Sequence, residues 1–253
     1  MDTQILFGKA VSAHIKDELS KDIAKLKKKN ITPGLAAIIV GNDPASKVYV
    51  RNKSKAFKNN GCYSETFSLP SDTLEKDLLD LITDLNDDEK FHGILVQLPL
   101  PSHIDSKKVL NHVNPTKDVD GFHPLNLGHL LEGNPSFIPC TPNGIIKMLE
   151  YYNIETTGRH VVIIGRSNIV GKPMFALLSQ KFQKGNSTVT ICHSRTKDLK
   201  FYTQNADIIV SAIGVPSFLK GDMVKDGVVI IDVGINRVED RSIERGYRIV
   251  GDV

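Results

Sequence analysis

Cysteine is scarce in this sequence of 253 residues, and its three cysteines are far apart, at Cys62, Cys140 and Cys192. Their odd number and the lack of a C-x-x-C pair argue against a disulfide framework and a cysteine zinc site. The eight histidines are scattered and form no H-x-x-x-H pair, so we predict no metal site. Free thiols favour a reducing compartment, and we expect the protein in the cytoplasm.

Long apolar runs are missing as well. No stretch reaches the ~18 consecutive apolar residues that span a bilayer, and the N-terminus lacks the basic start and apolar core of a signal peptide. The net charge is only +3. The short lysine cluster Lys27–Lys29 follows a helical pattern over residues 11–26, which indicates a solvated helix end. We therefore expect a soluble protein with neither a membrane partner nor a nucleic-acid partner.

The sequence does contain enough apolar material for a sizeable core, with 40% hydrophobic and 24% charged residues. Short apolar runs alternate with helical periodicity, which is typical of a parallel sheet covered on both faces. The stretch 101–140 differs, because it is rich in Pro, His, Asn, Gly and Asp, and we expect loops with short helical turns there. We predict an α/β fold with two α/β domains, residues 1–140 and 141–253, the second with a Rossmann-like parallel sheet. Strands are expected at 34–41, 91–98, 161–165, 187–192, 206–212 and 228–233, and helices at 46–60, 74–85, 143–152 and 170–180.

The helix expected after residue 46 carries Tyr49 and Lys53 four positions apart, hence on one face. An amphipathic surface helix whose lysine reaches into solvent explains this spacing. The location favours a second interpretation, because ligands of open parallel sheets bind beyond the carboxyl ends of the strands. The helix follows directly from the strand at 34–41, and a partly buried lysine there can donate and accept protons.

Gln97 interrupts the apolar run GILVQLPLP at residues 93–101. A buried amide without a hydrogen-bond partner costs roughly 2–7 kcal/mol. Gln97 is therefore either a satisfied core group or a side chain that faces a cleft. Because it stands at the carboxyl end of a strand, it can face the same crevice as Lys53 and orient that lysine.

Asp120 lies in the segment Lys117–Gly121, within the loop-rich stretch. An ordinary turn explains an Asp-Gly pair. The functional interpretation is a carboxylate held by a tight turn, which accepts paired hydrogen bonds from an amidine-like edge such as that of a pterin or guanine. The residues themselves leave both interpretations open.

The loop GRSNIVGKP at residues 165–173 follows an expected strand and opens an expected helix. It is not G-x-G-x-x-G, since serine takes the place of the second glycine, so the motif supports dinucleotide binding only in part. Backbone N–H groups at such a helix start favour phosphate. The next strand ends without the acid that binds the ribose of NAD; Ser194 and Arg195 follow it, and with Arg166 they suit the 2′-phosphate of NADP. A solvated loop is the alternative.

Together these stretches resemble the bifunctional methylenetetrahydrofolate dehydrogenase/cyclohydrolase family, from about residue 5 to the last residue. The resemblance implies a folate-binding catalytic domain and an NADP-binding domain on either side of a cleft. It implies NADP-dependent oxidation of 5,10-methylenetetrahydrofolate to 5,10-methenyltetrahydrofolate and hydrolysis to 10-formyltetrahydrofolate, in one-carbon metabolism, by a homodimer. The motifs that carry it are VGNDPAS with Tyr49 and Lys53, GILVQLPLP, NPTKDVDGFHP, PCTP, GRSNIVGKP and IDVGIN.

The resemblance also implies roles for four residues on the folate side. Lys53 is expected to be the general acid/base of the cyclohydrolase step. Gln97 is expected to face the folate cleft, hydrogen-bond Lys53 and position it. Tyr49 is expected to pack on the folate and orient it, and Asp120 to hold the amino edge of the pterin.

On the cofactor side the resemblance implies contacts from five residues. Gly165, Arg166 and Ser167 are expected to contact NADP. Ser194 is expected near the 2′-phosphate of NADP, and Ile235 near its nicotinamide half.

The chain departs from the family pattern at Gly251–Val253, where the family continues with a helical segment, a proline- and glycine-rich stretch and a final helix. That segment would border both ligands, so we expect a form that ends at Val253 to have weakened stability and low or absent activity. Two alternatives stay open. One is a truncated, inactive NADP-binding homologue. The other is an NADP-dependent dehydrogenase of shikimate type, which shares a similar loop at 165–173 but does not explain Lys53 together with Gln97.

Overall fold

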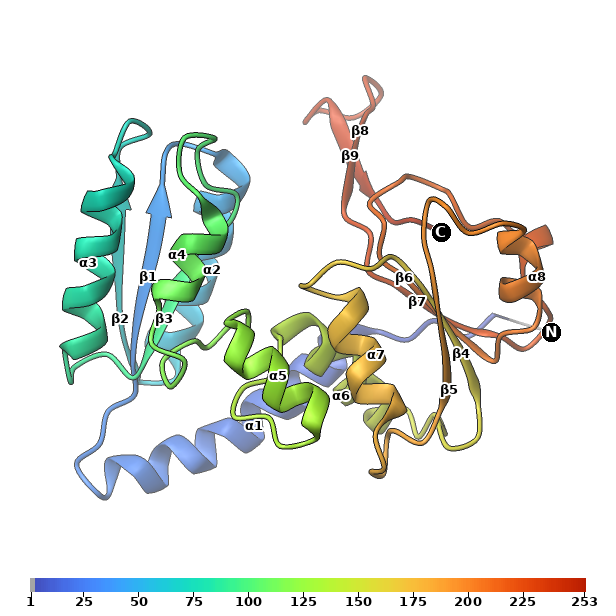
Figure 1. Cartoon of the computed structure of the whole chain (residues 1–253), viewed down its shortest axis with the longest axis horizontal. Coiled ribbons are helices and arrows are strands. Elements are labelled where there is room, and N and C mark those ends of the chain that lie inside the picture. The colour runs from blue at the N-terminus through green and yellow to red at the C-terminus, as the bar shows by residue number, and fades with distance from the viewer. Residues whose placement is uncertain (1–2) are drawn as a thin grey trace. The chain divides into compact units, whose positions relative to one another are not determined.

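The computed structural model describes residues 3–253, apart from the side chain of residue 45. The chain divides into two compact units, one that ends at Gly128 and one that runs from His129 to Val253 (Figure 1). Each unit contains a parallel sheet with helices, which confirms the predicted α/β class. The cleft implied by the resemblance and the domain boundary after residue 140 stay predictions.

The first unit is built on a three-stranded parallel sheet in the order β2-β1-β3. The central strand β1 (Gly34–Val40) is buried along its whole length, as its apolar run predicts. It pairs on one side with β3 (Gly93–Val96) and on the other with β2 (Tyr63–Leu69). The sequence pattern did not predict β2, because this edge strand has no apolar run and Ser64 is its one buried residue.

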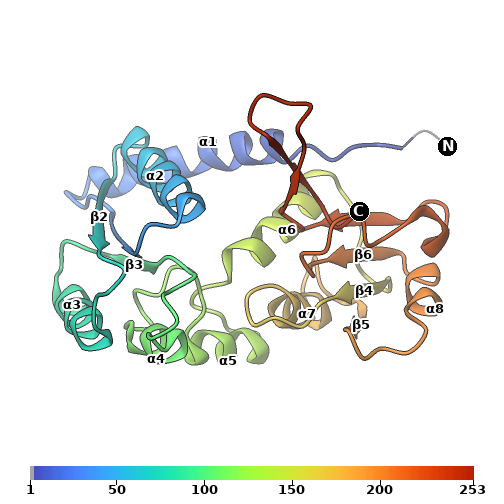
Figure 2. The ribbon, with the colours of Figure 1, turned by 90° about the horizontal axis from the view of Figure 1, so that it is seen from above.

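Helices cover both faces of this sheet (Figure 2). Successive strand residues point to opposite faces. Leu35, Ala37 and Ile39 therefore pack with Val50 and Phe57 of α2, whereas the alternate residues of β1 pack with α3 and α4. The helices of this part of the chain are α1 (Gly8–Lys27), α2 (Pro44–Asn59), α3 (Glu75–Asp87) and α4 (Ser106–His112).

The carboxyl end of β3 has two neighbours that matter for the site. The Gln97 N–H donates to the carbonyl of Ile38 at 2.9 Å, and Pro99 then lacks an N–H, so β3 is shorter than predicted. On the other side the Ile94 N–H donates to the carbonyl of Lys117 at 2.7 Å, and Ile94 forms a parallel bridge with Asp118. The loop that carries Asp120 therefore extends the edge of this sheet.

Two helices follow this loop, α5 (Pro124–Glu132) and α6 (Cys140–Tyr151). The predicted helix at 143–152 thus begins earlier, at Cys140. Pro142 falls in its first turn, where the missing N–H of proline would have no intrahelical partner in any case.

The second unit has a four-stranded parallel sheet in the order β5-β4-β6-β7, which agrees with the predicted Rossmann-like sheet. Its core includes Val162, Ile164, Cys192, Ile209 and Leu219. The predicted strands are all present with small shifts of their ends. The elements are β4 (His160–Ile164), α7 (Gly171–Ser179), β5 (Thr188–Cys192), α8 (Leu199–Gln204), β6 (Ile208–Ser211), the 3₁₀ helix η1 (Gly221–Met223) and β7 (Val229–Asp232).

An antiparallel hairpin formed by β8 (Asn236–Glu239) and β9 (Tyr247–Val250) projects from this unit (Figure 1). The guanidinium of Arg237 lies 3.9 Å from the centre of the Tyr247 ring. The sequence pattern did not predict the hairpin, because its side chains are exposed or half-buried and form no apolar run.

Candidate active site

The start of α2 positions Lys53. After β1 the chain turns at Gly41, whose φ is +87°. The Asp43 carboxylate then accepts the Ser46 N–H at 2.7 Å and caps the helix, and Pro44 stands at its first position, where proline is favoured. The stretch NDPAS therefore starts α2 at the carboxyl edge of the sheet, and Lys53 lies further along this helix.

The ammonium of Lys53 lies 3.9 Å from a carboxylate oxygen of Asp120. The Asp120 side chain is 14% exposed and the Lys53 side chain 41%, so a nearly buried carboxylate faces a half-exposed ammonium. Ion pairs that water can reach contribute about 0–1 kcal/mol. A bound ligand can therefore separate the two groups. The structure brings together two of the four residues predicted for the folate side.

Gln97 does not join this pair through a hydrogen bond. Its side-chain amide donates to the carbonyl of Leu98 at 2.8 Å, and within residues 3–253 no hydrogen bond links it to Lys53. The expected hydrogen bond between Gln97 and Lys53 is therefore absent from the described residues. The Gln97 amide bonds the Leu98 carbonyl of its own turn, and the Lys53 ammonium faces Asp120. Tyr49, one turn before Lys53, is 47% exposed. The roles of these residues stay predictions.

A buried carboxylate that the sequence analysis did not single out fixes the loop that carries Asp120. Asp118 is 5% exposed, and one of its oxygens accepts the His123 N–H at 2.8 Å and the Asn126 side-chain amide at 2.9 Å. The Gly121 N–H donates to the Asp118 carbonyl at 3.1 Å and closes the turn around Asp120. The only signal in the sequence was the pair of acids in DVDG, which an ordinary turn also explains.

The predicted cofactor loop begins at Gly165, which has a φ of +120°. A Cβ at Gly165 would collide with the carbonyl of Ala212, and a Cβ at Gly171 would collide with the carbonyl of Gly165. The loop therefore folds back on itself, in close contact with its own backbone and with that of Ala212. The Ser167 hydroxyl accepts the Val170 N–H at 3.0 Å and so helps to start α7. A glycine turn that leads into a helix start is a place that favours a phosphate group.

Ser194 lies in a turn beside this loop. The Gly165 N–H donates to the carbonyl of Cys192 at 2.9 Å, so the chain segments after β4 and β5 leave the sheet next to each other. Hydrogen bonds within residues 193–196 close the turn. Ser194 and Arg166 are both exposed, and no carboxylate ends β5. A hydroxyl and a cation at this place fit the 2′-phosphate of NADP better than the free ribose hydroxyl of NAD.

Ile235 is exposed in the loop after β7, which lies at the same edge of the second sheet. This loop and the loop after β6 converge on Asp252, a fully buried side chain that the sequence analysis mentioned only within the final GDV. Burial raises the pKa of the Asp252 carboxyl. The N–H of Ile213, the Asn236 amide and two further backbone N–H groups outweigh that effect, so the pKa lies below its ordinary value.

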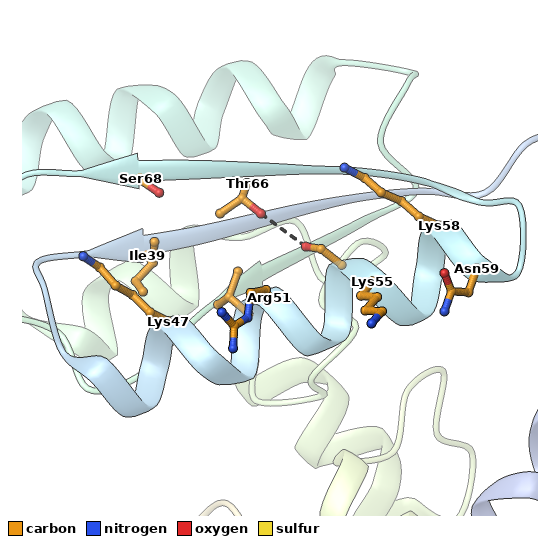
Figure 3. A pocket seen from close by; sticks show the side chains of 10 residues that line it. Ile39, Lys47, Arg51, Lys55, Lys58, Asn59, Thr66 and Ser68 are labelled. Carbon is orange, nitrogen blue, oxygen red and sulfur yellow. Dashed lines mark hydrogen bonds between the residues drawn. The ribbon is translucent and has the colours of Figure 1, made fainter.

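A groove of ≈ 490 Å³ lies between α2 and β2 (Figure 3). The Ser54 and Thr66 hydroxyls lie 3.2 Å apart in its wall. Neither Tyr49 nor Lys53 lines it, so this groove is separate from the residues predicted for folate. Cations spaced three or four residues apart on one face of α2 line it: Lys47, Arg51, Lys55 and Lys58.

Residues 3–253 contain no group of three or more His, Cys, Asp or Glu side chains that could hold a metal ion. Within those residues, no helix combines the length and the apolar character needed to cross a membrane. Burial raises the pKa of the Cys62 and Cys192 thiols, which keeps them in the neutral form.

Two family models match successive parts of the chain. Residues 6–120 match the tetrahydrofolate dehydrogenase/cyclohydrolase catalytic domain, and residues 139–253 match the NAD(P)-binding domain of the same family. Over 252 residues the chain is 53% identical to the bifunctional protein FolD of Chlorobium chlorochromatii (strain CaD3), a match that covers 98% of this chain and 85% of that protein. It is 51% identical over 253 residues to the bifunctional protein FolD of Acetivibrio thermocellus, covering 100% of this chain and 85% of the relative.

Solved structures agree with these matches. The bifunctional enzyme FolD from Campylobacter jejuni has a TM-score of 0.91 and 49% identity, over 99% of this chain and 86% of that one. The Trypanosoma brucei methylenetetrahydrofolate dehydrogenase-cyclohydrolase, complexed with NADP cofactor and inhibitor, has a TM-score of 0.92 and 38% identity, over 100% of this chain and 86% of that one. Both family models belong to one family, which decides against the shikimate-type alternative. The expected resemblance is confirmed, and the chain belongs to the tetrahydrofolate dehydrogenase/cyclohydrolase family.

Proposed function

We propose that the protein oxidises 5,10-methylenetetrahydrofolate to 5,10-methenyltetrahydrofolate with NADP and then hydrolyses the product to 10-formyltetrahydrofolate. The observation that carries the proposal is the match of a catalytic-domain model and an NAD(P)-binding-domain model to successive parts of one chain. Relatives that match 98% or more of the chain are named bifunctional proteins, which favours two activities over an inactive NADP-binding homologue.

Lys53 and Asp120 are the groups that we assign to the folate chemistry. Hydrolysis adds water across the methenyl carbon and opens one carbon–nitrogen bond, so a proton must leave the water and reach the departing nitrogen. The Lys53 ammonium, half-exposed and 3.9 Å from Asp120, can deliver and recover that proton. The Asp120 carboxylate has two oxygens that can accept paired hydrogen bonds from the amino edge of a pterin. Occupation of Asp120 by substrate would free Lys53 to act.

Gln97 and Tyr49 are assigned supporting roles. The Gln97 amide needs only to give up one carbonyl partner, that of Leu98, to turn toward Lys53 or the substrate. The exposed ring of Tyr49 lies one helical turn before Lys53 and offers a flat surface for the folate rings.

NADP, when bound, accepts the hydride that the methylene carbon loses. We assign its phosphates to the glycine turn at Gly165 and the start of α7, where an added Cβ at Gly165 would collide with the Ala212 carbonyl. Arg166 and Ser194, both exposed, would hold the 2′-phosphate, with Ser167 at the same loop. Ile235 would lie against the nicotinamide half.

Three further properties belong to this proposal. The folate-binding domain covers residues 1–140 and the NADP-binding domain residues 141–253. The protein acts in the cytoplasm, in keeping with its free thiols. It works as a homodimer, an expectation that rests on the family resemblance.

The test combines two assays on one protein. Methylenetetrahydrofolate and NADP are mixed with the protein and NADPH absorbance is followed, and hydrolysis of methenyltetrahydrofolate is measured without cofactor. Lys53→Ala should lower the hydrolysis rate by about 100-fold or more, the range of general acid–base catalysis, while calorimetric NADP binding persists. Lys55→Ala is the matched control, since Lys55 lines the separate groove on another face of α2. Equal hydrolysis by the two variants would remove Lys53 from its role, and NADP binding without any turnover would favour the inactive homologue.

A further inference from the structure

Asp252 joins the two loops at the carboxyl edge of the second sheet. One carboxylate oxygen accepts the Ile213 N–H at 2.9 Å, the Gly214 N–H at 3.3 Å and the Ser211 hydroxyl at 3.3 Å. The other accepts the Val215 N–H at 2.9 Å. One fully buried side chain therefore fixes consecutive backbone groups of the loop that follows β6.

The same carboxylate reaches the loop after β7. Its second oxygen accepts the Asn236 side-chain amide at 3.0 Å, and the same amide lies 3.2 Å from the carbonyl of Gly251. A Cβ at Gly234 would collide with Asp252, so the loop after β7 passes in direct contact with the carboxylate. The two loops therefore both contact the same carboxylate.

Asp252 is itself held by a second acid. The Asp232 carboxylate at the end of β7 accepts the backbone N–H of Asp252 at 2.9 Å and that of Val253 at 3.2 Å. The Leu219 N–H donates to the Asp252 carbonyl at 2.9 Å. The backbone of Asp252 is therefore fixed on both sides, and its carboxylate reaches the loops from a fixed position.

The position of this cluster gives it a functional meaning. In an open parallel sheet the cofactor binds beyond the carboxyl ends of the strands, and both loops held by Asp252 stand there, after β6 and β7. We infer that Asp252 is a positioning residue for the NADP site, whose carboxylate sets the shape of the loops after β6 and β7 before the cofactor arrives. This inference rests on the proposed use of NADP at that edge.

Asparagine at this position would damage the loops without changing side-chain size. The substitution replaces one carboxylate oxygen by an NH₂ group. In either orientation of the new amide, that NH₂ group faces N–H or O–H donors, with which it cannot form a hydrogen bond as a donor. The loops would then be loose in the free protein and would have to be ordered by the cofactor itself. Binding should weaken, whereas turnover at saturating cofactor should persist.

The experiment compares Asp252→Asn with Asp207→Asn. Asp207 belongs to the same unit but accepts the His160 N–H at 2.9 Å and the Lys225 ammonium at 2.7 Å at the opposite edge of the sheet. For Asp252→Asn we expect the calorimetric Kd and the KM for NADP to rise by about tenfold, in line with the loss of one hydrogen bond to a charged group. The kcat of the dehydrogenase and the cyclohydrolase rate should stay within about twofold. Asp207→Asn should leave the NADP Kd unchanged.

Three results would overturn the inference: an unchanged NADP Kd in Asp252→Asn, equal changes in Kd in the two variants, or a loss of kcat without a change in KM. If Asp252→Asn loses its circular dichroism signal for folded protein, the NADP Kd of Asn236→Ala tests the inference instead. That variant removes one donor and keeps the carboxylate, and an unchanged Kd in it overturns the inference. A wild-type protein that binds NADP without turnover would contradict the proposed function while leaving this comparison intact.

Discussion

Replacement of Asp118 by alanine tests whether the loop that carries Asp120 is held by one buried acceptor. In the wild-type protein a single Asp118 oxygen receives both the His123 N–H and the Asn126 amide. Asn126 is 1% exposed, and its side-chain amide donates a second hydrogen bond to the Pro115 carbonyl at 3.0 Å. Alanine removes the acceptor and leaves two donors without it, the buried Asn126 amide and the half-buried His123 N–H.

The expected magnitude follows from those two donors. Each buried donor without a partner costs about 1–3 kcal/mol. Asn126 keeps one of its bonds, so we expect a loss of about 3 kcal/mol in the free energy of unfolding. Asparagine should lose only about 1 kcal/mol, because both hydrogen bonds end on the same oxygen and an amide oxygen can replace it at reduced strength.

Urea unfolding followed by far-ultraviolet circular dichroism measures the stability of both variants. The KM for methenyltetrahydrofolate in the hydrolysis assay reports the position of Asp120, and it should rise in Asp118→Ala and change little in Asp118→Asn. An alanine variant as stable as the wild type would refute the reasoning. Equal damage by alanine and asparagine would mean that the negative charge, rather than the acceptor, is required.

Other predictions concern the second unit. Gly171→Ala should weaken NADP binding and destabilise the fold by about 1–3 kcal/mol, because the new Cβ meets a carbonyl of the same loop; thermal unfolding and NADP titration check this. Arg166→Ala combined with Ser194→Ala should weaken NADP more than NAD in paired titrations, and an unchanged preference would place the phosphate contact elsewhere. The Lys225 ammonium and a backbone N–H of β4 hold the pKa of Asp207 below its ordinary value of 3.8. Its carboxylate therefore stabilises the fold above that pH and ceases to do so as the pH falls through the lower folded-state value, so Asp207→Asn should flatten the decline of Tm at acid pH.

The strands predicted from sequence carry apolar residues, and this includes β5 and β7, which stand at the edges of the second sheet and are only partly buried. β1, β4 and β6 are covered by helices or neighbouring strands, so each needs a short apolar run, and such a run is visible in the sequence. β2 stands at an edge, and β8 and β9 form an exposed hairpin. Their side chains do not have to be apolar, so periodicity could not reveal them.

The sequence named candidate site residues, whose roles stay predictions, but it did not reveal the contacts that they make. Lys53 and Asp120 lie close together because the loop at 117–118 pairs with the edge of β3. Neither motif in the sequence predicts that pairing. Gln97 bonds the adjacent carbonyl instead of Lys53 because the nearest acceptor lies in its own turn. The sequence did not single out Asp118 or Asp252 for a related reason: their carboxylates accept backbone N–H groups, which every sequence contains.

The place of β1 at the centre of the first sheet has a consequence for biosynthesis. Its neighbours on both sides, Tyr63–Leu69 and Gly93–Val96, are translated later. At about 5–20 residues per second, the ribosome releases this wholly apolar strand seconds before its second partner exists. A nascent chain in that interval presents GLAAIIV with both of its backbone edges unpaired, and this is the stretch that a chaperone acting during translation would have most reason to cover.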